Sequence, residues 1–212
     1  MRTDDLVRTL VADHATRAAP VGRTLAIALV LGLALATALF VLMLGPRDDF
    51  ATVAADPRFV FKFVVTLTLA ASAAALVLRL ACPGVETRFS ALALAAGPAL
   101  LTLGVIVELV LGPSSAWTTK LVGRNAIVCL TYIPLLSAPL LVAALIALRH
   151  GAPMRPGFAG AVAGLLAGGL GATLYASHCI DDSPLFVATW YTIAIAGVTL
   201  LGSLAGARLL RW

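Results

Sequence analysis

The hydrophobic residues of this chain fall into six long runs separated by short polar segments. The runs cover residues 25–44, 59–78, 90–111, 126–148, 157–176 and 185–207. Each has about 20 residues, the length that a helix needs to cross ~30 Å of hydrocarbon. None shows the strict alternation of polar and apolar residues that is typical of strands in a membrane barrel. The pattern therefore predicts six membrane-spanning helices joined by short connections.

Composition supports lipid as the solvent of this chain. Of its 212 residues, 61% are hydrophobic and only 12% are charged, and the mean hydropathy is +1.02. Soluble domains carry about 25% charged residues. We expect an all-α, polytopic membrane protein with three parts: a polar N-terminal segment (1–24), a six-helix domain (25–207) and a short tail (208–212). The first apolar run is too long for the core of a cleaved signal peptide, so we expect it to remain as an anchor.

Basic residues predict the orientation of the helices. Of the 15 lysines and arginines, ten lie on the side of the N-terminus and five on the other side. Since cytoplasmic loops carry the excess of basic residues, we expect both termini of this multi-pass protein in the cytoplasm. We then expect the net charge of +5 to interact with anionic lipid headgroups. The arginines are scattered over four segments, so we expect no direct contact with nucleic acid.

The N-terminal segment contains a short amphipathic pattern. Thr3 is suited to cap a helix whose first turn holds Asp4 and Asp5. One apolar stripe of that helix would contain Leu6, Val7, Leu10, Val11 and His14. Such a helix either lies on the membrane surface or docks into the groove of a partner protein. The pattern alone leaves both interpretations open.

A polar break between the fifth and sixth runs holds the residues with the richest chemistry. It contains His178, Cys179, Asp181 and Asp182, and the predicted topology places it on the periplasmic side, where disulfides persist. Cys129 is predicted at a similar depth, about one turn inside the fourth helix. Cys82 is predicted on the cytoplasmic side.

Three interpretations of the two periplasmic-side cysteines compete. The thiols could switch between dithiol and disulfide, or they could bind a soft metal ion together with His178 and an aspartate. They could also be inert, with Cys129 as a packing residue and Cys179 as a loop thiol. Asp182 or Ser183, followed by Pro184, is also a suitable start for the sixth helix.

Small and polar residues inside the runs suggest contacts between helices. Gly160, Gly164 and Gly168 recur every four residues, which favours close packing against a neighbouring helix. That neighbour could belong to the same chain or to a second copy in a homo-oligomer. Glu108 is expected to form an ion pair at the membrane interface with Lys120 and Arg124.

The sequence contains no motif of the common enzyme families, so we expect a protein that is not an enzyme. A transporter or channel subunit for a metal or small solute would show polar groups at mid-membrane, which the runs lack. That function and a purely structural membrane scaffold remain the alternatives.

Several motifs together resemble the NrsF-type family of membrane anti-sigma factors, formerly a domain of unknown function numbered 1109. The matching stretches, in chain order, are Met1-x-Thr3-Asp4-x-Leu6 with Leu10, Arg124…Cys129…Pro134…Pro139-Leu140, Leu148-Arg149-His150-Gly151-Ala152-Pro153, the glycine-rich fifth run, Tyr175-x-x-His178-Cys179-x-Asp181-Asp182-x-Pro184, Trp190-Tyr191 and Leu210-Arg211-Trp212. The tract from His178 to Tyr191 is the most specific of these.

The resemblance implies a regulatory role and a multi-pass protein of the bacterial inner membrane. In such proteins the cytoplasmic N-terminal segment binds an extracytoplasmic-function sigma factor, and two cysteines at the outer face respond to heavy metals or oxidants. Carried over here, the sensor cysteines are Cys129 and Cys179, and the docking residues are expected among Thr3, Asp4, Leu6, Val7, Leu10 and Val11. The resemblance implies no resident cofactor, although a heavy metal could bind transiently.

Overall fold

The computed structural model describes Asp5 and residues 21–82 and 84–211. Within these residues all regular structure is helical, as the apolar runs predict. The six residues expected to dock a partner, from Thr3 to Val11, lie outside the described part of the chain.

Six helical segments are long and apolar enough to cross a membrane. Three are single helices of the first, second and fourth runs: α2 (Val21–Met43), α4 (Pro57–Leu80) and α8 (Ala126–Leu148). The fifth is α9 (Pro156–Ala176). The third segment combines α5 (Arg88–Ala93) with α6 (Ala96–Leu111). The sixth segment combines α10 (Pro184–Phe186), the π-helical turn η2 (Val187–Tyr191) and α11 (Thr192–Leu209). Short connections contain α3 (Phe50–Val53), η1 (Ser114–Ala116) and α7 (Trp117–Val122). The expected all-α fold and its six long helices are confirmed.

The third segment is broken where the sequence suggested one helix. Pro98 has no amide hydrogen, and its ring would clash with the carbonyl of Leu94 in a continuous helix. The chain relieves this conflict with a turn at Leu94 and Ala95, whose amides bond three residues back to Ala91 and Leu92. The membrane segment Arg88–Leu111 therefore consists of two helices.

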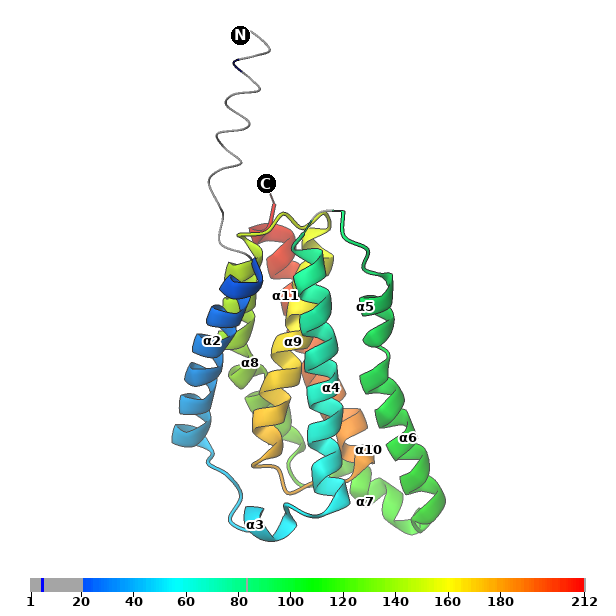
Figure 1. Ribbon diagram of the computed structural model, residues 1–212. Helices are drawn as coiled ribbons and strands as arrows, with labels where there is room; N and C mark the ends of the chain where they lie inside the picture. The colour runs from blue at the N-terminus through cyan, green and yellow to red at the C-terminus, as the bar shows by residue number, and fades with distance from the viewer. Residues whose placement is uncertain (1–4, 6–20, 83, 212) are drawn as a thin grey trace.

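Helix α9 lies at the centre of the bundle and is enclosed by α4, α8 and α11 (Figure 1). Its glycines provide the close approaches. A Cβ atom on Gly160 would lie 2.2 Å from the carbonyl oxygen of Gly202, and one on Gly164 would lie 2.6 Å from Cα of Thr199, both in α11. A Cβ on Gly168 would contact Ile195, which also belongs to α11. The predicted glycine stripe thus packs against a helix of its own chain.

The two ends of the bundle differ in what they carry. Helix α2 begins and α11 ends at one end, here called the proximal end (Figure 1). The opposite end, here called the distal end, carries α3, α7 and residues 177–183, the segment that joins α9 to α10. Residues 177–183 contain Cys179 and are called the Cys179 loop below. Cys82 is exposed and follows α4 at the proximal end, apart from the other two cysteines.

Candidate functional site

Cys129 and Cys179 lie in one buried hydrophobic cluster at the distal end. Cys129 occupies the first turn of α8, Cys179 belongs to the Cys179 loop, and both side chains are fully enclosed. The aromatic residues Tyr175, Phe186 and Tyr191 complete the same cluster. Both cysteines are free thiols. Residues that are 50 positions apart in the sequence are therefore brought to the same place by the packing of α8 against α9.

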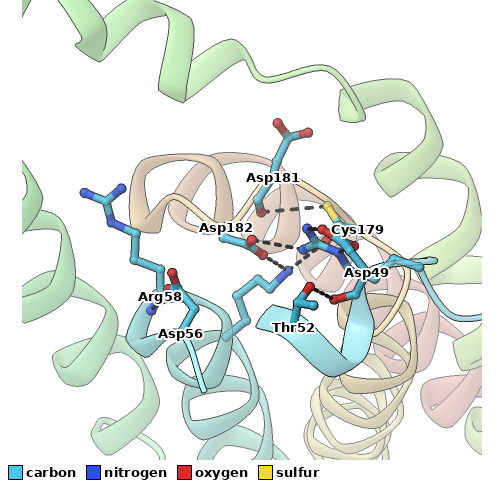
Figure 2. A network of polar contacts seen from close by, with 9 residues as sticks. Asp49, Thr52, Asp56, Arg58, Cys179, Asp181 and Asp182 are labelled. Atoms are coloured by element: carbon cyan, nitrogen blue, oxygen red, sulfur yellow. Dashed lines mark hydrogen bonds and ion pairs between the residues drawn. The ribbon is translucent and has the colours of Figure 1, made fainter. Parts of the chain in front are cut away.

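Two cations hold the Cys179 loop in place (Figure 2). The ammonium of Lys62, fully buried on α4, donates to the carbonyl oxygen of Cys179 at 2.8 Å and pairs with the carboxylate of Asp182. The guanidinium of Arg47 donates to the other oxygen of Asp182 at 3.0 Å and, at 3.4 Å, to the carbonyl of Cys179. Hydrogen bonds to Asp49 and Asp182 raise the pKa of Arg47, so its charge is permanent. Both cations thus act on the same two acceptors.

Asp181 has a different role from its neighbour Asp182. Its carboxylate accepts hydrogen bonds from the backbone amides of Arg124 at 3.0 Å and Asn125 at 2.9 Å, directly before α8 begins. This position is favourable because a helix N-terminus has free amides and a partial positive charge. The backbone carbonyl of Asp181 also lies 3.8 Å from the sulfur of Cys179. Asp181 therefore ties the loop of one cysteine to the helix of the other.

The start of the sixth segment follows the expectation for a capped helix. The hydroxyl of Ser183 accepts a hydrogen bond from the amide of Leu185 at 3.2 Å, and Pro184 occupies the first helical position. The two aspartates are left free to hold α8 and the cations.

The candidate metal ligands do not converge in the structure. His178 uses its Nδ1 atom in a hydrogen bond of 3.0 Å with the carbonyl of Gly45, and both aspartates have the partners given above. In the described part of the chain, no three side chains among His, Cys, Asp and Glu are placed to hold a metal ion. The arrangement therefore offers two thiols and no preassembled metal centre.

The surroundings of the thiols are apolar but contain two tyrosine hydroxyls. Tyr175 and Tyr191 are fully buried, and neither hydroxyl has a hydrogen-bond partner among the described residues. Burial raises the pKa of the Cys179 thiol, while the positive charge of Lys62 opposes this shift. Because the thiolate is the reactive form, burial disfavours the reactive state of Cys179 and Lys62 favours it.

Glu108 lies in a second ion pair of the distal end. Its buried carboxylate, near the end of α6, pairs with Lys120 and accepts a hydrogen bond from Arg58 at 3.2 Å. Lys120 was the expected partner, whereas Arg58 replaces the expected Arg124. The backbone amide of Arg124 instead binds Asp181.

The sequence analysis missed Lys62 and Arg47 as parts of the site. A signal for Lys62 was present, since a charged residue within an apolar run is a functional candidate by default. Arg47 gave no such signal, because it stands in a polar segment whose neighbours across the fold cannot be deduced from the sequence.

Comparisons with known proteins agree on one family. Residues 10–212 match the model of the family described as negative regulator of sigma F (NrsF). The anti-sigma-F factor NrsF of Caulobacter vibrioides (strain NA1000 / CB15N) is 36% identical over 217 residues, and all of both chains is covered. The probable anti-sigma-F factor NrsF of Azospira oryzae (strain ATCC BAA-33 / DSM 13638 / PS) is 33% identical over 215 residues, again with both chains fully covered. No solved structure matches this chain.

These matches span the six helices, the Cys179 loop and both cysteines, and they confirm the resemblance found in the sequence motifs. The family is one of regulatory proteins, in agreement with the absence of enzyme motifs. The chain belongs to the NrsF family of negative regulators of sigma F.

Proposed function

We propose that this protein is an anti-sigma factor of the bacterial inner membrane, which holds an extracytoplasmic-function sigma factor through residues 1–24. The observation that carries the proposal is the match along the whole chain to relatives named anti-sigma-F factors. A change at Cys129 and Cys179 on the periplasmic side then releases the sigma factor.

The distribution of charge supports this orientation. Arginines gather at the proximal end, as they do in cytoplasmic segments: Arg79 and Arg88 on either side of the loop 81–87, Arg149 and Arg155 in the loop 149–155, and Arg208 and Arg211 at the end of α11. The distal end then faces the periplasm, where oxidants and metal ions first meet the cell. In this orientation residues 1–20 are in the cytoplasm with the sigma factor.

The buried pair of thiols favours oxidation over metal binding as the signal. Two thiols can pass two electrons and two protons to hydrogen peroxide, which is reduced to two water molecules, while the two sulfurs join in a disulfide bond. This step needs no resident cofactor. A soft metal ion that acts on the same pair would bind transiently, since the carboxylates and His178 Nδ1 are already engaged.

Nothing favours the alternative of a transporter. The charged side chains buried within the described residues are Lys62 and Glu108, and each is paired at the distal end. A solute pathway would need polar groups through the middle of the bundle. The glycine stripe, whose neighbour the sequence left open between the same chain and a second copy, packs against α11 of the same chain.

Deleting residues 1–20 tests the docking part of the proposal. We expect transcription from a promoter of the sigma factor to become constitutive, because the helix bundle remains but the docking segment is gone. The measurement is a transcriptional reporter, together with an immunoblot that verifies the amount of protein in the membrane. Full repression by the truncated protein would refute docking through this segment.

Replacing both Cys129 and Cys179 by serine tests the sensor part. We expect repression without stress to persist and the response of the reporter to peroxide and to cadmium to be lost. Cys82→Ser is the matched control, since that thiol lies at the other end, and it should respond like the wild type. An unchanged response of the double variant would exclude these cysteines from signalling.

A further inference from the structure

Helix α2 is the element that follows residues 1–20, and it is held on one side only. Its main neighbour is α8, where a Cβ on Gly32 would lie 3.1 Å from both Ala143 Cβ and the carbonyl oxygen of Pro139. Most of its other large side chains are exposed in the protein, among them Val30, Leu31, Val41 and Leu42. A helix with a single packed face can shift along or away from its neighbour more easily than the enclosed α9.

The distal end of α2 is fastened directly to the Cys179 loop. Beyond Met43, the carbonyl of Gly45 bonds His178 Nδ1 at 3.0 Å, and the amide of Arg47 donates to the carbonyl of Ser177 at 3.1 Å. The Arg47 side chain, only 8% exposed, adds its contacts with Asp182 and Cys179. Arg47 is also fixed from its own side by Asp49, at 2.8 Å. The segment after α2 and the Cys179 loop therefore form one connected unit.

We propose that Arg47 is the positioning residue that couples the Cys179 loop to α2, and that α2 carries a change in the loop to residues 1–20. This inference rests on the proposed function. Helix α2 has 23 residues. At 1.5 Å per residue it spans about 35 Å, which takes the chain from the proximal end to the segment bound to the Cys179 loop.

The link follows from the atoms that Arg47 binds. A bond between the sulfurs of Cys179 and Cys129 requires their Cβ atoms to approach within about 4.5 Å. An approach that shifts the backbone of Cys179 also shifts its carbonyl, which is an acceptor for both Lys62 and Arg47. Lys62 belongs to the well-packed α4, whereas Arg47 belongs to the segment that ends α2. The displacement is therefore passed to the helix that is easier to move.

A cross-linking experiment tests the coupling without the sigma factor. The position of a Cβ on Gly22, at the proximal end of α2, lies 3.7 Å from Leu78 of α4. Gly22→Cys and Leu78→Cys are introduced in the full chain after the three native cysteines are replaced by serine, and are joined in membranes by a short bis-maleimide. We expect Arg47→Ala to remove most of the cross-linked product and Arg47→Lys, which keeps a cation near Asp182, to restore it.

Arg58→Ala is the matched control, because Arg58 also pairs with a buried carboxylate at the distal end but does not touch the Cys179 loop. It should leave the cross-link unchanged. Equal yields for Arg47→Ala and Arg58→Ala would overturn the proposal, since a purely local role of Arg47 leaves the far end of α2 in place.

The reporter gives an independent readout. Arg47→Ala is expected to raise transcription without oxidant at least about fivefold, the lower end of ordinary coupling free energies. The rise should persist when Cys129 and Cys179 are serine, because Arg47 acts after the thiols. Immunoblots verify equal amounts of protein, and a variant that accumulates poorly is replaced by Arg47→Gln. Wild-type repression at equal amounts would overturn the coupling, whereas failure of the deletion of residues 1–20 to release the sigma factor would refute only the docking segment.

Discussion

Replacing Gly160 by alanine is expected to force α9 and α11 apart and to lower the thermal stability of the protein strongly. The added methyl group would lie 2.2 Å from the carbonyl oxygen of Gly202 and 2.8 Å from Cα of Gly206. Both atoms belong to the backbone of α11, so no side chain can rotate away to make room. Overpacking in a rigid interior costs about 1–3 kcal/mol, and we expect the upper part of this range because a whole helix must shift. Thermal unfolding of the purified protein in detergent measures the loss.

Gly197→Ala provides the matched control on the partner helix α11. Gly197 is also helical, but a Cβ atom placed on it would have open space around it. Apart from its two chain neighbours and the backbone of its own helix, no atom lies within 4 Å of that position. Alanine there should leave stability unchanged or raise it, because alanine is favoured over glycine by about 1 kcal/mol inside a helix. If both variants unfolded at the same temperature, close packing at Gly160 would not be what holds α9 to α11.

The sequence was sufficient to predict the six helices because lipid imposes a simple requirement. Each segment must satisfy its own backbone hydrogen bonds and be about 20 residues long, so apolar runs report helices almost directly. Local interruptions were harder. The break before Pro98 depends on how one proline is accommodated, and the π-helical turn at Val187–Tyr191 has no composition that marks it. The glycines of the fifth run predicted close packing but not that α9 lies at the centre of the bundle.

The cysteine pair was predictable from topology, but its setting was not. Equal depth of Cys129 and Cys179 followed from counting residues to the ends of the predicted helices. The division of labour between Asp181, which caps α8, and Asp182, which binds two cations, depends on the packing of segments far apart in the sequence. A metal site was left open by the residue types alone, and the geometry gives it no assembled set of ligands among the described residues.

Replacing Lys62 by methionine is expected to loosen the Cys179 loop while keeping the shape of the side chain. The variant removes the hydrogen bond to the carbonyl of Cys179 and one of the two cations on Asp182. Breaking a buried ion pair costs about 3–5 kcal/mol, and we expect the lower end because Arg47 still pairs with Asp182. The measurements are thermal unfolding in detergent and the rate at which maleimide labels Cys179. Labelling should become faster, since water and reagent reach a thiol that is fully buried in the wild type.

Two further variants separate the buried charge from a general effect of losing a cation. Arg58→Met removes a cation whose side chain is 56% exposed and whose partner Glu108 keeps Lys120, so the expected loss of stability is about 0–1 kcal/mol. Adding Asp182→Asn to Lys62→Met should recover part of the lost stability. The neutral amide of asparagine replaces a carboxylate whose charge has lost its buried partner. It should not restore slow labelling, since the carbonyl of Cys179 still lacks the hydrogen bond from Lys62 and keeps only the longer one from Arg47. If Lys62→Met left both stability and labelling as in the wild type, Lys62 would have no part in closing the site.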